Sequence, residues 1–416
     1  MRQKCISFFT CAAVALCASA LWGQEDSAKG SQPNVPRLKV LSWHKAPPKK
    51  EDVEAMKNLA ANNSSKSLPL WTLFTEASRD DNGYSGVMVG RDPFNGGGGV
   101  NVATYIVPLK ITTHQIAVSV NSKGILTNKP GKTVFDPTAT DKACLGSSNN
   151  VPATLFEQSP IFKNTNFDFG GTIVGDTQYV DAFQRGNFWQ VEDRDHYHVL
   201  LGPVKTLKAI DLDVPVKYGT ALATTALGPP AFCAPMAIVD IGWFDTWVAN
   251  TLIPALSSQG VNPSNLPIVF VHNVVWSIGP PELNDCCAIG YHSWTGYPLQ
   301  TYSSINFDYT DLFGPAILDT AVASHEVAEW MNDPFGNNPT PGWSAGQATG
   351  FCQTNLEVGD PLTGTEAPRI AMSNGFTYHL QELAFFSWFF GSPSVGIHNW
   401  FSNNGTFLTD AGPPCM

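Results

Sequence analysis

The sequence predicts an α+β protein in which a β-rich N-terminal region precedes a domain whose principal helix packs on a small sheet. Only 14% of the 416 residues are charged, and 36 Gly with 31 Pro are typical of a loop-rich, β-rich chain. Residues 76–215 contain short β-like runs separated by turn residues. Residues 216–416 mix helical and strand-like segments, and a chain of this length predicts two domains or one large one.

The N-terminus has the pattern of a secretory signal peptide. Arg2 and Lys4 precede an apolar stretch, and the small residues Ala18 to Ala20 offer a cleavage site. We therefore expect residues 1–23 to be removed and the protein to be secreted, to the extracellular space or the periplasm. Residues 24–75 are rich in Ser, Lys, Asn and Pro and are expected to form a polar tether, with a short helix near its end.

The cysteine count changes when the signal peptide is removed. The remaining residues are Cys144, Cys233, Cys286, Cys287, Cys352 and Cys415. An even number in an oxidising compartment predicts up to three disulfides, with about 15 possible pairings. Adjacent cysteines rarely bond to each other, so we expect Cys286 or Cys287 to reach Cys352 or Cys233.

The net charge is −11 at pH 7. An acidic surface repels nucleic acid and anionic membranes, so neither is expected as a partner. After the signal peptide no run approaches the ~20 consecutive apolar residues that a membrane helix requires. The sequence leaves the oligomeric state open.

The expected elements follow from apolar periodicity. In the N-terminal half we expect strands or β-like runs over residues 99–109, 115–120, 179–189 and 197–204. In the C-terminal half we expect a helix over 240–258, strands over 266–276 and 288–295, and a helix over 315–332 with Pro315 in its first turn.

The last of these helices carries the motif SHEVAEWMNDP, residues 324–334. It is an HExxE pattern, one residue away from the HExxH helix of zinc metallopeptidases. At about 100° per residue, His325 and Glu329 lie within ~40° of each other. The remaining helix surface is largely apolar, so the helix should be buried and its polar groups should be paired or bind a cation. Glu326 projects about 100° from His325, where a general base would lie.

These residues predict a metal site. His325, Glu329 and one of Glu357 or Asp360, in the later sequence LEVGDP, would bind zinc, with Glu326 as the base. His292 and Asp333 are possible accessory residues. So many carboxylates also suit calcium or manganese. The alternative is a His–Glu hydrogen bond that merely satisfies two buried side chains.

A second histidine pair is a weaker candidate. His196 and His198, near Asp193 and Asp195, alternate on a predicted strand, but no third ligand is evident, and ordinary strand residues are the favoured interpretation. His272 and Met372 are interpreted as core residues.

The motifs CAIGYHSW, SHEVAEWMNDP and LEVGDP together resemble the secreted phosphate-induced (Exordium-like) proteins and their bacterial relatives. The resemblance covers residues 286–361. It implies a zincin-like metallopeptidase domain in residues 216–416.

Two functions are therefore considered. One is a secreted metal-dependent hydrolase, a metallopeptidase-like protein acting on a polypeptide or a cell-surface polymer through Glu326. The other is a non-catalytic secreted binding protein, associated with the cell wall or with carbohydrate, in which the HExxE cluster is a structural or relic metal site.

Overall fold

The computed structural model describes residues 38–416 except 63, 65, 147–149, 194–195 and 345–350. Residues 35–416 belong to one compact unit. The predicted signal peptide and the first part of the predicted tether lie outside the described residues. The described part of residues 24–75 contains helix α1 (Lys50–Ala61) and most of strand β1 (Leu70–Ala77), so it is folded and does not form a tether.

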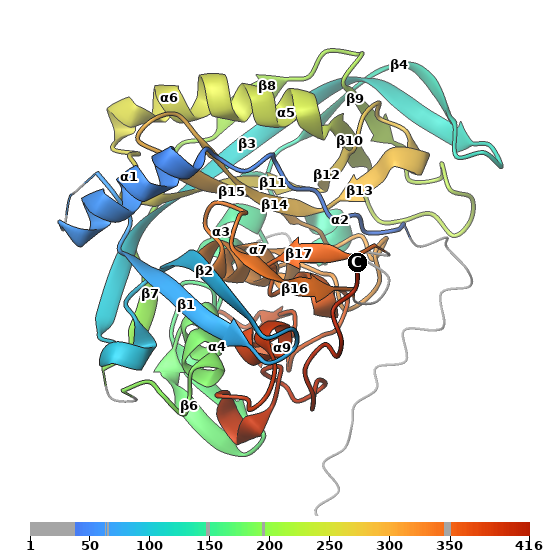
Figure 1. Ribbon diagram of the computed structural model, residues 1–416. Coiled ribbons are helices and arrows are strands. Elements are labelled where there is room, and N and C mark those ends of the chain that lie inside the picture. The colour runs from blue at the N-terminus through green and yellow to red at the C-terminus, as the bar shows by residue number, and fades with distance from the viewer. Residues whose placement is uncertain (1–37, 63, 65, 147–149, 194–195, 345–350) are drawn as a thin grey trace, which may run out of the picture. The chain divides into compact units, whose positions relative to one another are not determined.

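An eleven-stranded, barrel-like sheet is the largest element (Figure 1). Its main path is β13-β12-β10-β9-β3-β11-β15-β14, and β4, β7 and β8 also pair with β3. The strands are β3 (Gly99–Val120), β4 (Leu126–Phe135), β7 (His198–Thr206), β8 (Ile210–Asp213), β9 (Gly219–Leu222), β10 (Met236–Asp240), β11 (Leu266–His272), β12 (Val274–Ser277), β13 (Cys286–Ala288), β14 (Gly290–Thr295) and β15 (Gln300–Phe307).

The predicted fold class is wrong in one central respect. β3, from the N-terminal half, pairs in parallel with β11, from the C-terminal half, and β11 pairs in parallel with β15. Both halves therefore build one large sheet, and the helix with the HExxE motif does not pack on a small sheet of its own. Local periodicity identifies a buried strand such as β11, but it does not show which distant strands lie beside it.

Shorter elements surround this sheet. Two-stranded sheets are formed by β1 with β2 (Asn82–Val89), β5 (Thr165–Phe169) with β6 (Thr172–Thr177), β16 (Pro339–Trp343) with β17 (Gln353–Asn355), and β18 (Ile370–Ala371) with β19 (Thr377–Tyr378). The other α-helices are α2 (Lys142–Leu145), α3 (Pro152–Glu157), α4 (Tyr179–Asn187), α5 (Ile241–Trp247), α6 (Ile253–Leu256), α7 (Ala321–Asn332) and α9 (Phe386–Phe390). A π-helical turn, η2 (Val248–Leu252), joins α5 to α6, and 3-10 turns are η1 (Pro93–Asn95), η3 (Ser257–Gln259), η4 (Leu283–Asp285), η5 (Asp360–Leu362) and η6 (Ile397–Asn399).

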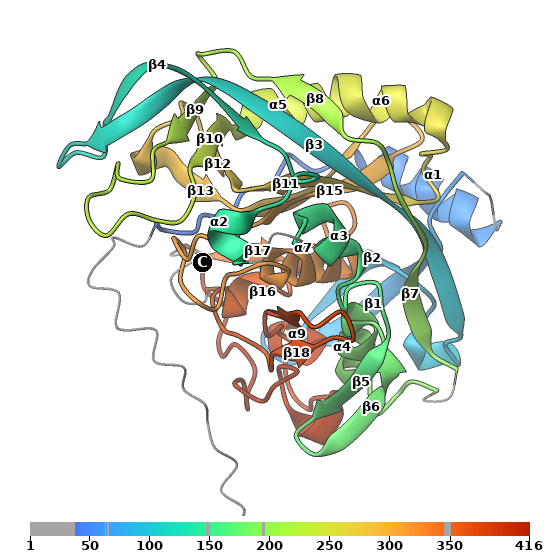
Figure 2. The ribbon, with the colours of Figure 1, turned by 180° about the vertical axis from the view of Figure 1, so that it is seen from behind.

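Helices cover the two faces of the sheet, with α5 and α6 on one face and α7 on the other (Figures 1 and 2). Successive side chains of β11 alternate between them. Ile268 and Phe270 belong to the core that contains α7, while Val269 and Val271 belong to the core that contains α5. We call these the α7 face and the α5 face. A strand buried on both sides reads as a continuous apolar run, as residues 266–276 do.

Several predicted elements differ in the structure. Residues 99–120 form one strand, and 266–276 is divided between β11 and β12. Residues 179–187 form helix α4 where a β-like run was expected, because Tyr179 and Phe183, four apart, share a helix face that packs inward. The motif helix begins at Ala321, later than Pro315, since Asp319 has a positive φ of 37° and the chain turns before the helix.

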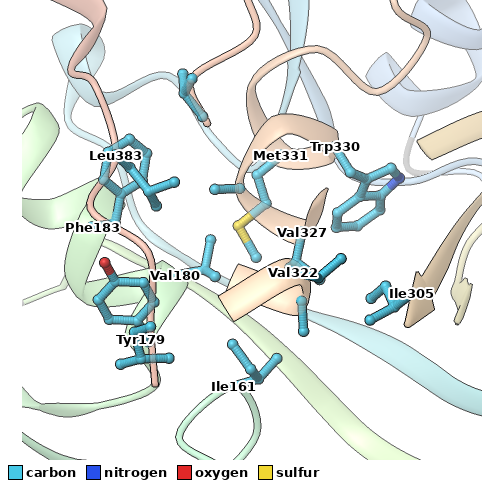
Figure 3. Close-up of a cluster of buried hydrophobic side chains, with 14 of the residues drawn as sticks. Ile161, Tyr179, Val180, Phe183, Ile305, Val322, Val327, Trp330, Met331 and Leu383 are labelled. Carbon is cyan, nitrogen blue, oxygen red and sulfur yellow. The ribbon is translucent and has the colours of Figure 1, made fainter. Parts of the chain in front are cut away.

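The prediction that α7 is buried is confirmed. All of its residues except His325 are buried. Figure 3 shows Val322, Val327 and Met331 among side chains from other elements, including Val180 and Phe183 of α4. The helix is therefore held in place by apolar contacts, and its charged side chains have little solvent around them.

The prediction of three disulfides is confirmed, but the expected pairing is wrong. Cys144 pairs with Cys233 and Cys352 pairs with Cys415. Their Cα separations of 5.2 and 5.8 Å suit disulfide geometry. Cys286 and Cys287 pair with each other, since neither alternative partner remains available.

Candidate metal centre

Helix α7 places His325, Glu326 and Glu329 beside one cavity at the α7 face. His325 Nε2 lies 3.0 Å from Glu329 Oε1, as expected for residues four apart on one helix face. The other ring nitrogen, Nδ1, lies 3.1 Å from Gln381 Oε1. An amide oxygen can only accept, so Nδ1 carries the hydrogen and Nε2 faces the carboxylates.

His292 enters the same cluster from strand β14. Its Nε2 lies 3.0 Å from the carbonyl oxygen of Asp333 and donates a hydrogen bond to it. Nδ1 therefore faces the acids, 3.7 Å from Glu326 Oε2 and 3.8 Å from Glu329 Oε2. Gly290, two residues earlier, leaves room for this approach, because a Cβ there would lie 2.6 Å from Glu326 Oε1.

The loop after β17 supplies the remaining carboxylates. Its backbone N–H groups at Gly359 and Asp360 donate to Glu329 Oε1 over 3.1 and 3.2 Å. Asp360 Oδ1 lies 3.6 Å from His325 Nε2. Glycine is required at 359 because a Cβ there would lie 2.5 Å from His325 Cγ. The loop thus packs directly on the motif helix.

Glu357 is the most informative member of the cluster. It is fully buried, and its Oε1 accepts a hydrogen bond of 2.6 Å from Asn355 Nδ2. Its other oxygen, Oε2, has no hydrogen-bond partner among the described residues. A buried carboxylate oxygen without a donor is costly, so this group requires either a proton, as a lone buried carboxyl does, or a positive partner.

The pKa values record an excess of negative charge. Burial alone would lower the pKa of His325, but Glu329 and the other nearby carboxylates raise it well above its usual value. Burial raises the pKa of Glu357 well above its usual value, and the charge of Glu329 adds to this effect. Burial acts to raise the pKa of Glu329 as well, yet His325 outweighs it and lowers that pKa to about 2. The shifts of His325 and Glu357 thus both follow from several carboxylates buried close together.

The donor atoms fit a divalent cation. Ligand atoms of His292, Glu329 and Glu357 lie within 4.8 Å of one another, and so do those of His325, Glu326 and Glu329. Imidazole nitrogen and carboxylate oxygen are donors that zinc accepts, and the carboxylates also suit manganese or calcium. Both His residues have the outer ring nitrogen fixed by an oxygen acceptor, which is the usual support for a histidine ligand.

The structure places most of the predicted site residues close together. His325, Glu326, Glu329, Glu357 and Asp360 come together, and His292 lies more centrally than an accessory residue. The side chain of Asp333 does not join them. Its carboxylate accepts the backbone N–H groups of residues 337 and 338, over 2.8 and 2.9 Å, and closes the turn after α7.

Sequence analysis missed two residues that contact the cluster. Gln381 orients His325, and His44 Nδ1 lies 3.4 Å from Glu357 Oε1. Neither belongs to a recognisable motif, so no local signal identified them. The other histidine pair does not form a joint site. His198, at the start of β7, contacts Asp181 of α4, whereas His196 lies in an exposed turn beside Asp193.

No family model, curated protein or solved structure matches the chain. The resemblance to the phosphate-induced group therefore stays a prediction. Within the described ranges, no helix has both the length and the apolar character needed to cross a bilayer. The three disulfides are typical of proteins that fold in an oxidising compartment.

Proposed function

We propose that this protein is a secreted metal-dependent hydrolase of the metallopeptidase-like class, with zinc as its cation. The observation that carries the proposal is the convergence of His292, Glu329 and Glu357. Beside them lies the buried Oε2 of Glu357, for which the described residues supply no hydrogen-bond donor. His325 and Asp360 lie against the same group and complete its donor set.

A divalent cation at this position would polarise a substrate carbonyl and lower the pKa of a bound water toward neutrality. The protein's own contribution is the placement of Glu326. This side chain borders the cavity, and its Oε2 lies 3.7 Å from His292 Nδ1. Burial raises the pKa of Glu326 above its usual value, toward the range in which a carboxylate is an effective general base. Glu326 would then accept the proton of a water that attacks the carbonyl.

The cellular location and the substrate belong to the same proposal. The predicted signal peptide and the disulfides support action outside the cytoplasm. A polypeptide or a cell-surface polymer is the substrate class available there. The similarity of residues 286–361 to the phosphate-induced proteins supports a zincin-like site, although the surrounding sheet is larger than that resemblance implied.

Elemental analysis combined with a Glu326→Gln variant tests this function. Purified protein should contain one zinc per chain, and the variant should retain it. Hydrolysis of a labelled protein substrate should fall by roughly 10²–10⁴-fold in the variant, the usual contribution of a general base. Glu51→Gln, at an exposed position on α1, is the matched control.

Each outcome has a separate meaning. Equal activity in both proteins would remove Glu326 from the mechanism. Bound metal without hydrolysis in either protein would favour the alternative, a binding protein with a structural metal site. Failure of zinc, manganese and calcium to bind would contradict the cation proposal itself.

A further inference from the structure

An extended segment, residues 38–45, crosses the cavity that contains the metal cluster. We call it the strap. Residues 40–44 of the strap line the cavity together with His292, Glu326 and Glu329. The strap precedes α1 in the chain and is separate from β14, α7 and the loop after β17, which carry the metal cluster.

The strap binds the sheet as an additional strand. Leu41 N donates to Cys287 O over 2.8 Å, and Cys287 N donates to Lys39 O over 3.0 Å. This is the hydrogen-bond pattern of parallel neighbours, with Val40 beside Cys287. β13 is the last strand on its side of the sheet path, so the strap occupies an edge that is otherwise available for pairing.

Side chains fix the strap over the acidic cluster. The ring of Trp43 packs edge-on against Tyr291, with centroids 4.9 Å apart. Ser42 Oγ donates to Asp360 Oδ2 over 2.8 Å, which directs the strap to a predicted metal ligand.

Two basic side chains complete this attachment. The imidazole of His44 lies 3.4 Å from Glu357 Oε1. Beyond the cavity, Lys45 Nζ donates to Trp294 O over 3.0 Å and lies 3.3 Å from Asp245 Oδ2.

These contacts are specific, and the apolar side chains Leu38, Val40 and Trp43 pack on the cores only as partly buried residues. Every residue from 38 to 45 is half-buried or exposed, whereas α7 beneath it is almost entirely buried. Residues Ala46 and Pro47, which lead toward α1, are exposed. A short segment that is only partly buried, and that leads toward α1 through an exposed connection, can leave without unfolding the sheet.

We propose that the strap is an internal peptide ligand that keeps the cavity closed, and that an extended polypeptide takes its place along β13 once the strap has left. The pairing with β13 selects an extended backbone, and the acidic cluster selects polar or basic side chains at the positions of Ser42 and His44. The substrate role of that polypeptide rests on the proposed function, but closure of the cavity by the strap does not.

Accessibility of the cavity is measured with an Ala321→Cys variant, labelled by a small methanethiosulfonate in EDTA. Ala321 lines the cavity and is 2% exposed. A Lys45→Met substitution removes the charged anchor, and labelling should become about tenfold faster, as for loss of one charge-assisted hydrogen bond. Lys39→Met is the matched control, because Lys39 is exposed and contributes only its backbone to the pairing. Its labelling rate should not change.

A second variant tests closure of the cavity without relying on the Lys45 contact alone. A recognition site for a sequence-specific protease replaces residues 46–49, so that cutting frees the strap while α1 onward stays intact. Labelling should increase at least tenfold after the cut. A synthetic peptide with the sequence of residues 38–46, LKVLSWHKA, should slow it again, and a shuffled peptide should not.

The results separate the parts of the proposal. Unchanged labelling after cutting and washing would show that the strap does not close the cavity. Faster labelling that the peptide fails to reverse would exclude an extended polypeptide as the ligand. Zinc uptake is measured on the same samples without EDTA. A cavity that opens to the thiol reagent but takes up no zinc would contradict the proposed function and leave the closure by the strap standing.

Discussion

Buried carboxylates have different partners on the two faces of the central sheet. On the α5 face, the buried carboxylate of Asp245 accepts a hydrogen bond of 2.5 Å from Tyr302 and lies 3.3 Å from Lys45 Nζ. On the α7 face, several carboxylates converge, and in the described part of the chain their recorded ion pairs are with histidine alone. On the α5 face, the positive partner is the side chain of Lys45. The other face carries a group of His and carboxylate side chains that could hold a cation.

The first prediction uses the apolar packing of the α5 face. Phe244 is fully buried and packs on Trp276, with ring centroids 5.3 Å apart. Phe244→Ala should lower the free energy of unfolding by about 3–5 kcal/mol because it leaves a cavity. Zinc stoichiometry should not change, since this side chain lies across the sheet from the cluster. Urea unfolding and elemental analysis measure the two quantities.

A matched control is Phe74→Ala, at a side chain that is 69% exposed. It should change stability by less than about 0.5 kcal/mol. Loss of zinc in the Phe244 variant would mean that the two faces are coupled and would weaken the distinction between them.

The second prediction separates burial of a carboxylate from membership of the metal cluster. Asp308 is buried outside the cluster. Its Oδ1 accepts hydrogen bonds from Thr310, and its Oδ2 has no partner among the described residues. Burial raises the pKa of Asp308 to about 6. Between pH ~4 and ~6 the folded protein keeps a proton that the unfolded chain releases, so stability should fall as pH rises through this window.

Asp308→Asn should remove that step and stabilise the protein above pH 6 by roughly 3 kcal/mol or less, the equivalent of a shift of about two pH units. Urea unfolding at pH 4 and pH 8 measures it, with the exposed Asp211→Asn as control. Zinc affinity should be unaffected. An unchanged pH dependence would show that Asp308 is solvated.

The third and smallest predicted effect concerns the orientation of His325. Gln381 accepts from His325 Nδ1 over 3.1 Å and donates to Gly359 O over 2.6 Å. Gln381→Met keeps the volume but removes both hydrogen bonds, and zinc affinity should fall by about 10–100-fold. A competition titration with a chelator measures it. Gln259→Met, at an exposed position, should have no effect. Equal affinity in both variants would exclude His325 from the ligand set.

The local pattern predicted the motif helix, its burial and most of the site. On an apolar helix, the HExxE spacing places His325 and Glu329 on one buried face. The sequence also predicted that Glu357 and Asp360, in the later sequence LEVGDP, would lie near them. The strand of His292 was also predicted. These predictions depend on residues that are close in sequence, because helix and strand geometry fixes the directions of their side chains.

Other features required the tertiary structure. β-like residues 179–187 became α4 because their aromatic side chains pack inward as a helix face. The partners of β3 are separated from it by more than a hundred residues in the case of β11, and no local pattern encodes that pairing.

By itself, therefore, the sequence determined which buried helix carries the HExxE motif, and it did so through periodicity. Only the tertiary structure decided that this helix packs on a sheet shared by both halves of the chain, that one oxygen of Glu357 has no hydrogen-bond partner in the described part of the chain, and that residues 38–45 cross the site. Those facts depend on contacts between distant segments, and their positions are set by burial of apolar surface rather than by local spacing.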